Sequence, residues 1–431
     1  MSGNRQPSLT PYILFGMFVL EIFFLFVKKI DGTVYGVFDL VEKLYPVIAV
    51  GLLLFFVKPR LNAQWGVALL LYATYLLYGV LVSLAQQKGI KIILVQLYHE
   101  MKFFPMIFLF AMTTCDQRWS RITLQIIKPI IFFSIALVLF QLAAPGAYDA
   151  LFSNGGHFEK GHIAGMQLPR LVGWFWHPGQ IALFFVISTV FFIIEYRKGN
   201  IRFGLSMVLL STLFVLLAIQ RFELLILLIV LMLFWFRRYT GVDYRPHLAA
   251  LTVLLFATGL LYIISDQAHF WALLEDFNSP RTVFLVEALF TLVETNYWGA
   301  GWGTIGSHAA ADVAQVYDYN AMKDIWWVKL DLYFYDTYWP HVIGETGLPG
   351  FFLLLLSMTF MLRGLNSPEA SILLFVLILT SALSSNAQSL YHLTVFGWFI
   401  MLLENNHDVR TAREPAQMTQ FHNPDFKGAL A

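Results

Sequence analysis

Cysteine and charge are both scarce in this sequence. The single cysteine, Cys115, excludes an intrachain disulfide and any zinc or iron–sulfur site built from cysteines. Only 13% of the residues are charged, roughly half the share found in soluble domains. Neither sign is in excess, because 28 lysines and arginines stand against 27 aspartates and glutamates. The chain as a whole therefore has no field that favours an anionic partner.

Apolar residues take the place of the missing charge. They make up 58% of the 431 residues, and this is more apolar surface than one water-facing globule can bury. A soluble enzyme, a nucleic-acid-binding protein and a disordered protein are therefore excluded. The apolar runs are long and do not alternate with polar residues, so they predict helices rather than the strands of an outer-membrane barrel. The sequence predicts an all-α integral membrane protein.

Twelve apolar runs are read as membrane-crossing helices. They are 11–27, 44–57, 66–84, 91–113, 122–143, 178–196, 201–219, 222–236, 247–265, 349–362, 369–385 and 388–403. The first run is not a cleaved signal peptide, since it contains Glu21 and no small-x-small site follows before Lys28. We therefore expect one membrane domain over residues 1–403, followed by a polar, disordered cytoplasmic tail over 404–431.

Lysine and arginine set the orientation of the bundle. With the N-terminus inside, more of these residues fall in the internal loops and termini than in the external segments, as the positive-inside rule requires. An even number of spans places both termini in the cytoplasm. Two long segments are then external, 144–177 and 266–348, and the longer one is acidic, which suits the outside.

Charged side chains at membrane depth are costly, so each one raises a functional question. Arg221 lies in a polar break between two closely spaced apolar runs. It can snorkel outward or pair with Glu223, or it can face an external cavity and clamp a phosphate with its guanidinium. Lys102 lies in the middle of another run, where it can pair with Glu100 or Glu21 or reach a lipid phosphate, and we favour a structural pair.

The external segments carry three features that suit a binding site. Arg170 lies in a segment, 169–178, that leads directly into a helix. Residues 281–295 predict a further helix, which opens on Arg281. A glycine-rich stretch, 299–306, follows it. No strand precedes this stretch as a dinucleotide fold would require, so we expect its glycines to let the backbone approach an anion or a neighbouring helix.

The end of the longer external segment is rich in aromatic and acidic residues. Rings stack on the apolar faces of sugars and carboxylates accept hydrogen bonds from hydroxyl groups, so this composition suits a glycan. The alternative is a loop that folds its aromatic residues onto the bundle. No compact ligand spacing indicates a metal site, and none is expected. The candidate sugar-binding residues are Trp326, Trp327, Tyr335, Tyr338 and Trp339.

The helix expected after this loop has Pro340 in its first turn. His341 and Glu345 are then one helical turn apart on the same face, at the mouth of the bundle. They form either an acid–base pair or a satisfied surface pair. Glycines on the following turns, at 344, 347 and 350, indicate close contact with another helix.

Taken in order, these motifs resemble those of the O-antigen polymerases and O-antigen ligases, polytopic glycosyltransferases of bacterial envelopes with a large external loop near the C-terminus. The resemblance covers residues 162–360 in order and spacing. Its motifs are Arg170, Gly173 and Pro178 before a helix, the Gln220-Arg221 break, Arg281 opening a loop helix, the Gly-x-Gly-x-Gly-Thr-x-Gly stretch, and the segment Gly344-Glu345-Thr346-Gly347-Leu348-Pro349-Gly350.

The resemblance implies a GT-C-like glycosyltransferase of the bacterial inner membrane with a periplasmic active site and neither a metal nor a cofactor. The donor would be a glycan on undecaprenyl diphosphate. The acceptor would be a second lipid-linked repeat unit in a polymerase, or a lipid A core sugar in a ligase. Arg221 and Arg281 match the positions that bind the diphosphate, and Arg170 is a weaker match. A chain-length regulator would be a candidate partner.

One departure from the family favours the polymerase. Ligases carry a His-Asn pair nine residues before the glutamate of the Glu-x-Gly motif, and Asp336 occupies that place here. The general base is therefore open among Asp336, His341 and Glu345. The rival class is a secondary transporter, which should show two matching halves with broken helices at corresponding positions. No such internal symmetry is found in the sequence, and a non-catalytic scaffold would leave the external arginines unexplained.

Overall fold

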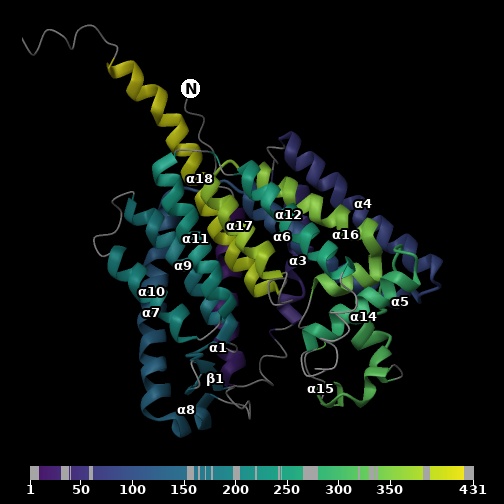
Figure 1. Cartoon of the computed structure of the whole chain (residues 1–431). Helices are drawn as coiled ribbons and strands as arrows, with labels where there is room; N and C mark the ends of the chain where they lie inside the picture. Colours follow the sequence, from purple (N-terminus) through teal and green to yellow (C-terminus); the bar gives the residue numbers. More distant parts are fainter. Residues whose placement is uncertain are drawn as a thin grey trace, which may run out of the picture.

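The computed structural model describes residues 9–30, 38, 40–57, 62–152, 160–163, 166–169, 171–175, 178–197, 204–218, 221–240, 243, 245–265, 280–318, 321–329, 334, 338–381 and 389–421. This part of the chain is dominated by helices, with one two-stranded antiparallel hairpin (Figure 1). The predicted all-helical character is therefore confirmed, apart from that short hairpin in the segment 144–177.

Most of the apolar helices overlap the predicted apolar runs, and the remaining elements lie in the two predicted external segments. They are α1 (Thr10–Ile30), α3 (Tyr45–Phe55), α4 (Ala63–Ala85), α5 (Ile90–Glu100), α6 (Phe103–Met112), α7 (Arg118–Ala143), α8 (Pro145–Phe152), β1 (Lys160–Ile163), β2 (Met166–Pro169), α9 (Pro178–Arg197), α10 (Gly204–Leu217), α11 (Arg221–Thr240), α12 (Arg245–Ser265), α14 (Pro280–Glu294), α15 (Trp326–Lys329), α16 (Trp339–Gly364), α17 (Pro368–Ser381) and α18 (Leu390–Phe421). A π-helical turn, η1 (Ala309–Val313), lies in the loop before α15. The predicted loop helix over 281–295 is confirmed as α14.

Several helices have the length and composition of membrane spans. Within the described residues, five stretches are long and apolar enough to cross a membrane: α4, Ile90–Met112, α7, α9 and α16 up to Gly364. Shorter apolar helices lie in α1, α10, α11, α12 and α17. A membrane-embedded helical protein is therefore supported, whereas the count of twelve spans stays a prediction.

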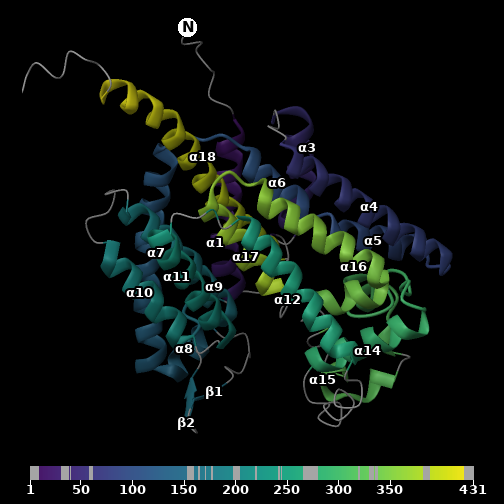
Figure 2. The same ribbon diagram turned by 45° about the horizontal axis from the view of Figure 1, so that its top comes forward.

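The helices form two groups joined by a central one. Figures 1 and 2 show α4, α5, α14, α15 and α16 on one side and α7, α10 and α11 on the other, with α17 and α18 between them. On the first side, α16 packs along α4 and also contacts α14 and α12. In the centre, α18 contacts α6, α17 and α1. Helix α17 is buried almost all round, which explains why it has no polar face.

Helix α16 begins at Trp339, so Pro340 lies in its first turn as predicted, ahead of the apolar run that starts at 349, and the helix contains a kink at Gly347. Gly347 has φ of +64°, a conformation that L side chains rarely adopt. A Cβ atom there would lie 2.3 Å from the carbonyl oxygen of Tyr297. Pro349 follows two residues later and lacks the N–H that a regular helix would use. The kink therefore lets the part of α16 before Gly347 pack against the glycine-rich loop.

Two further predicted boundaries differ from the structure. The run 91–113 is broken at residues 101–102 into α5 and α6. The break follows from Pro105, which has no N–H to donate to the carbonyl of Met101 and whose ring clashes with it. At the other end of the chain, α18 does not stop at 403 but continues to Phe421, so the start of the predicted disordered tail is helical.

Candidate active site

A buried carboxylate at the end of α5 is the centre of the strongest polar cluster. Glu100 is 3% exposed. Its Oε1 accepts a hydrogen bond from Gln96 Nε2 at 2.7 Å, and its Oε2 accepts from the hydroxyl groups of Tyr75 at 3.0 Å and Tyr338 at 3.1 Å. Tyr72 donates to the backbone carbonyl of the same residue, which the helix break would otherwise leave unpaired. The carboxylate is therefore held rigidly from α4, α5 and α16.

His341 joins this carboxylate from the first turn of α16. Its Nε2 lies 3.1 Å from Glu100 Oε1, and the imidazole is buried, with 6% of the residue exposed. A carboxylate bound to one ring nitrogen fixes the orientation of the ring and stabilises its protonated form. The neighbouring ring of Tyr338 packs edge-on against the imidazole. This arrangement suits a histidine that takes up a proton during a reaction.

Glu345, one turn further along α16, has a different set of partners. Its Oε1 accepts hydrogen bonds from the backbone N–H groups of Gly303 and Thr304, both at 2.9 Å, and of Ile305 at 3.2 Å. The hydroxyl group of Ser307 donates to the same oxygen at 2.6 Å. Oε2 is buried and accepts no hydrogen bond from the described part of the chain. Glu345 therefore anchors the glycine-rich loop, and neither it nor His341 is part of a surface pair.

A basic side chain lies near Glu345, the residue that anchors the glycine-rich loop. Lys88, between α4 and α5, is close enough to interact electrostatically with Glu345. Burial lowers the pKa of the Lys88 ammonium, and the Glu345 carboxylate acts in the opposite direction. The Glu345 charge thus has a basic counterpart in addition to its four hydrogen-bond donors.

The half-exposed edge of the cluster is formed by basic groups. Lys102 Nζ lies 2.8 Å from His99 Nδ1, and the His99 ring stacks on the His308 ring with a centroid distance of 3.8 Å and an interplanar angle of 11°. Asp312 Oδ2 lies 3.5 Å from His308 Nδ1. Burial lowers the pKa of His308, although Asp312 opposes that effect. Lys102 thus contacts His99, while Glu100, one of its predicted partners, is held by other side chains.

The predicted diphosphate-binding arginines are only partly placed. Arg281 lies in the first turn of α14 and is exposed. Arg221 is the first residue of α11, but its side chain lies outside the described residues. Arg170 lies outside them entirely, as do Tyr335 and the predicted candidate base Asp336. The role of these arginines therefore stays a prediction.

The predicted sugar-binding rings that are described lie in the core. Trp327 is fully buried and packs against Phe284. Trp339 is also buried, and its Nε1 donates to Ser381 Oγ at 3.0 Å. Tyr338 is engaged by Glu100, and Trp326 has its side chain outside the described residues. The alternative, in which the loop folds its aromatic residues onto the bundle, describes Trp327 and Trp339 better, because large apolar rings gain most from burial.

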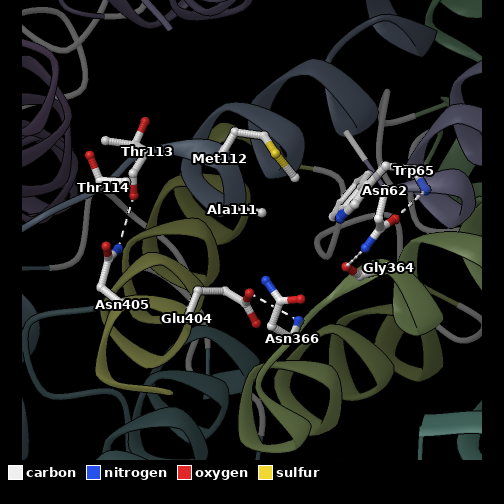
Figure 3. A pocket seen from close by; sticks show the side chains of 10 residues that line it. All are labelled: Asn62, Trp65, Ala111, Met112, Thr113, Thr114, Gly364, Asn366, Glu404 and Asn405. Atoms are coloured by element: carbon white, nitrogen blue, oxygen red, sulfur yellow. Dashed lines mark hydrogen bonds between the residues drawn. The ribbon is translucent and has the colours of Figure 1, made fainter. Parts of the chain in front are cut away.

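A second polar region lies at the opposite ends of α4 and α16 (Figure 3). It is a cavity of about 250 Å³ whose lining includes Asn62, Glu404 and Asn405. Asn62 caps α4 by accepting from the N–H of Trp65 at 2.9 Å, and it donates to the carbonyl of Gly364 at 2.8 Å. Glu404 accepts from two backbone N–H groups of the turn before α17. These polar side chains bind backbone groups, as structural caps do.

The sequence alone did not reveal most partners of the cluster. Tyr75, Gln96, Ser307 and His308 were not singled out, because none belongs to a recognisable motif. The one available signal was the dense polar stretch from His99 to Lys102 within an otherwise apolar run.

Comparison with known proteins adds no relative. No family model matches the sequence, and neither the curated proteins nor the solved structures include a similar chain. Function is therefore inferred from the residues of the site: the buried His341–Glu100 pair, the loop anchored by Glu345, and the basic edge formed by Lys102, His99 and His308.

Proposed function

We propose that the protein is a surface-polysaccharide polymerase that transfers a glycan chain from undecaprenyl diphosphate to the end sugar of a second lipid-linked repeat unit. The reaction would take place on the periplasmic face of a bacterial inner membrane, in a GT-C-like bundle of twelve spans with both termini in the cytoplasm. The observation that carries the proposal is the buried His341–Glu100 pair beside a half-exposed basic edge.

The transfer needs a base for the acceptor and a stabilised leaving group. His341 takes the proton of the acceptor hydroxyl as its oxygen bonds to the anomeric carbon of the donor. The bond between that carbon and the diphosphate oxygen breaks, and its electron pair leaves with the diphosphate. Glu100 orients the imidazole and stabilises the imidazolium that forms. Following the family resemblance, Arg221, Arg281 and Arg170 would bind the diphosphate.

The hydrogen bonds support His341 as the base. Glu345 is fully buried and its Oε1 accepts four hydrogen bonds that anchor the glycine-rich loop, so we assign it to holding the loop. His341 instead pairs with Glu100, and this carboxylate would stabilise the imidazolium formed on proton uptake. Asp336 lies outside the described residues, so it is assigned by experiment: Asp336→Asn should be mild if His341 is the base and severe if Asp336 is.

The decisive experiment uses the purified protein in detergent with undecaprenyl-diphosphate-linked repeat units as the only substrate. Products are separated on a gel and released undecaprenyl diphosphate is measured. A ladder of lengthened lipid-linked glycans, formed without a nucleotide sugar, would establish a polymerase. Transfer that begins only when a lipid A core acceptor is added would establish a ligase instead.

No transfer in either arm, with folded protein and native glycolipid, would contradict the enzyme. A secondary transporter would then be favoured, since a helix broken at a charged residue, as α5 and α6 are at Lys102, is a common feature of transporter binding sites. Uptake of the glycolipid or a smaller solute into proteoliposomes would be the next measurement.

A further inference from the structure

The basic edge of the cluster is not among the positions that the family resemblance assigns to the diphosphate. Lys102, His99 and His308 lie together at the break between α5 and α6, and each is partly exposed. The ammonium group of Lys102 also lies over the ring of Tyr98, 5.0 Å from its centroid. The three groups come from the helix break and from the loop, so the fold assembles them.

Lys102 supplies the formal positive charge of this edge, and its ammonium group lies 2.8 Å from Nδ1 of His99. Asp312, half exposed beside His308, offsets part of that charge. The edge therefore places one ammonium group and two stacked imidazoles next to the imidazole that we propose as the base.

We propose that Lys102, His99 and His308 form a binding subsite for a phosphate group carried by a lipid. An ammonium group and two imidazoles offer several N–H donors to phosphate oxygens, and such charge-assisted hydrogen bonds are the strong ones. The role of the subsite rests on the proposed function, in which it would hold the leaving diphosphate beside His341. Binding itself does not depend on catalysis.

A metal ion is a poorer occupant of the same groups. The Lys102 ammonium repels a cation and uses the lone pair of His99 Nδ1. The two imidazoles are stacked nearly parallel, so their ring nitrogens do not converge on one point. Metal ligands need deprotonated donors directed at a shared centre. An anion satisfies the arrangement better.

The loop that carries His308 is prearranged for this role. Ser307, the residue before it, donates to Glu345, and Gly303 and Thr304 bind the same carboxylate. Just after His308, the N–H of Ala309 donates to Gln96 Oε1 at 3.4 Å. His308 is thus fixed from both sides against His99, which lowers the cost of ordering the subsite when a phosphate binds.

The test measures equilibrium binding by the full-length protein in nanodiscs of neutral phosphatidylcholine. The probe is undecaprenyl diphosphate, and the variants are Lys102→Met, Lys102→Arg and His308→Gln. Loss of one charged donor should raise the Kd about 10- to 100-fold for Lys102→Met, and by less for His308→Gln. Lys102→Arg should stay closest to the parent. Lys323→Met, which removes an exposed lysine from the same external segment, is the matched control and should bind as the parent does.

Two further arms identify the source of the phosphate. Undecaprenyl diphosphate should bind more tightly than undecaprenyl monophosphate, and phosphatidylglycerol added to the nanodiscs should compete weakly. Equal competition by phosphatidylglycerol would assign the subsite to phospholipid headgroups. An unchanged Kd in both Lys102→Met and His308→Gln would overturn the subsite, even if polymerase activity is found. Lys102-dependent binding without any transfer would support the subsite while contradicting the proposed polymerase.

Discussion

The two polar regions of this protein lie at opposite ends of α4 and α16 and are built differently. At one end, Glu100 binds His341 and two tyrosines, so ionisable side chains contact one another. At the other end, around the cavity of Figure 3, Asn62 and Asn405 bind backbone groups. A side chain whose polar atoms bind backbone groups stabilises the fold and has no polar atom left for a reaction. Paired ionisable side chains can instead change protonation, as catalysis requires.

This difference separates activity from stability. Changes at the His341 end should lower the rate of glycan transfer with little effect on folding when the substitution keeps size and hydrogen bonding. Changes at the Asn405 end should lower stability and leave the rate of each folded molecule intact. A loss of transfer rate from a change at the Asn405 end, or a loss of stability from such a substitution at the His341 end, would contradict this comparison.

The largest effect is expected from His341→Gln. Glutamine keeps a donor that can reach Glu100 but cannot accept the acceptor proton, so the rate should fall about 10²- to 10⁴-fold, the usual contribution of a general base. The polymerisation rate of purified protein checks this, with thermal unfolding as the folding control. A rate near that of the parent would remove His341 from the mechanism and return attention to Asp336.

Glu100→Gln should have the second largest effect. The substitution keeps the shape of the side chain but removes the charge that stabilises the imidazolium, so kcat should fall about 10- to 100-fold. KM for the lipid-linked donor should change little, because Glu100 is only 3% exposed. Tyr75→Phe removes one hydrogen bond to the same carboxylate and is the matched milder variant. Equal losses in kcat from both variants would indicate a packing effect rather than a charge effect.

The sequence predicted the elements better than their contacts. Local patterns of charge, glycine and periodicity predict the apolar runs and the loop helix over 281–295. The same patterns indicate His341, Glu345 and Lys102 as candidate functional residues. The contact partners of these residues cannot be predicted from such patterns. Glu100 and His341, for example, are separated by 241 residues and meet only through the packing of distant helices. Nor did the pattern show that Trp327 and Trp339 are buried, since an aromatic loop has the same composition whether it faces a glycan or the bundle.

Asn405→Ala should have a smaller effect, and it should be on stability. Asn405 accepts from the N–H of Cys115 at 2.9 Å and donates to the carbonyl groups of Thr113 and Met401. Leaving buried backbone groups unpaired costs about 1–3 kcal/mol, so the thermal midpoint of unfolding should fall. Glycan transfer per folded molecule should match the parent. A selective loss of transfer with an unchanged midpoint would show that the cavity beside Asn405 takes part in function.

The smallest effect is expected from Asn62→Ala, which removes the cap of α4 and the hydrogen bond to Gly364 together. Losing an N-cap costs about 1 kcal/mol. Asn62→Ser separates the two contributions, because serine still caps the helix but is too short to bridge to α16. If the serine variant unfolds at nearly the midpoint of the parent, the cap contributes most of the stability and the hydrogen bond between the ends of α4 and α16 contributes little. If it unfolds as the alanine variant does, the bridge between α4 and α16 carries the stability. In that case the end of the molecule opposite His341 holds in register the two helices that supply Tyr75 and His341.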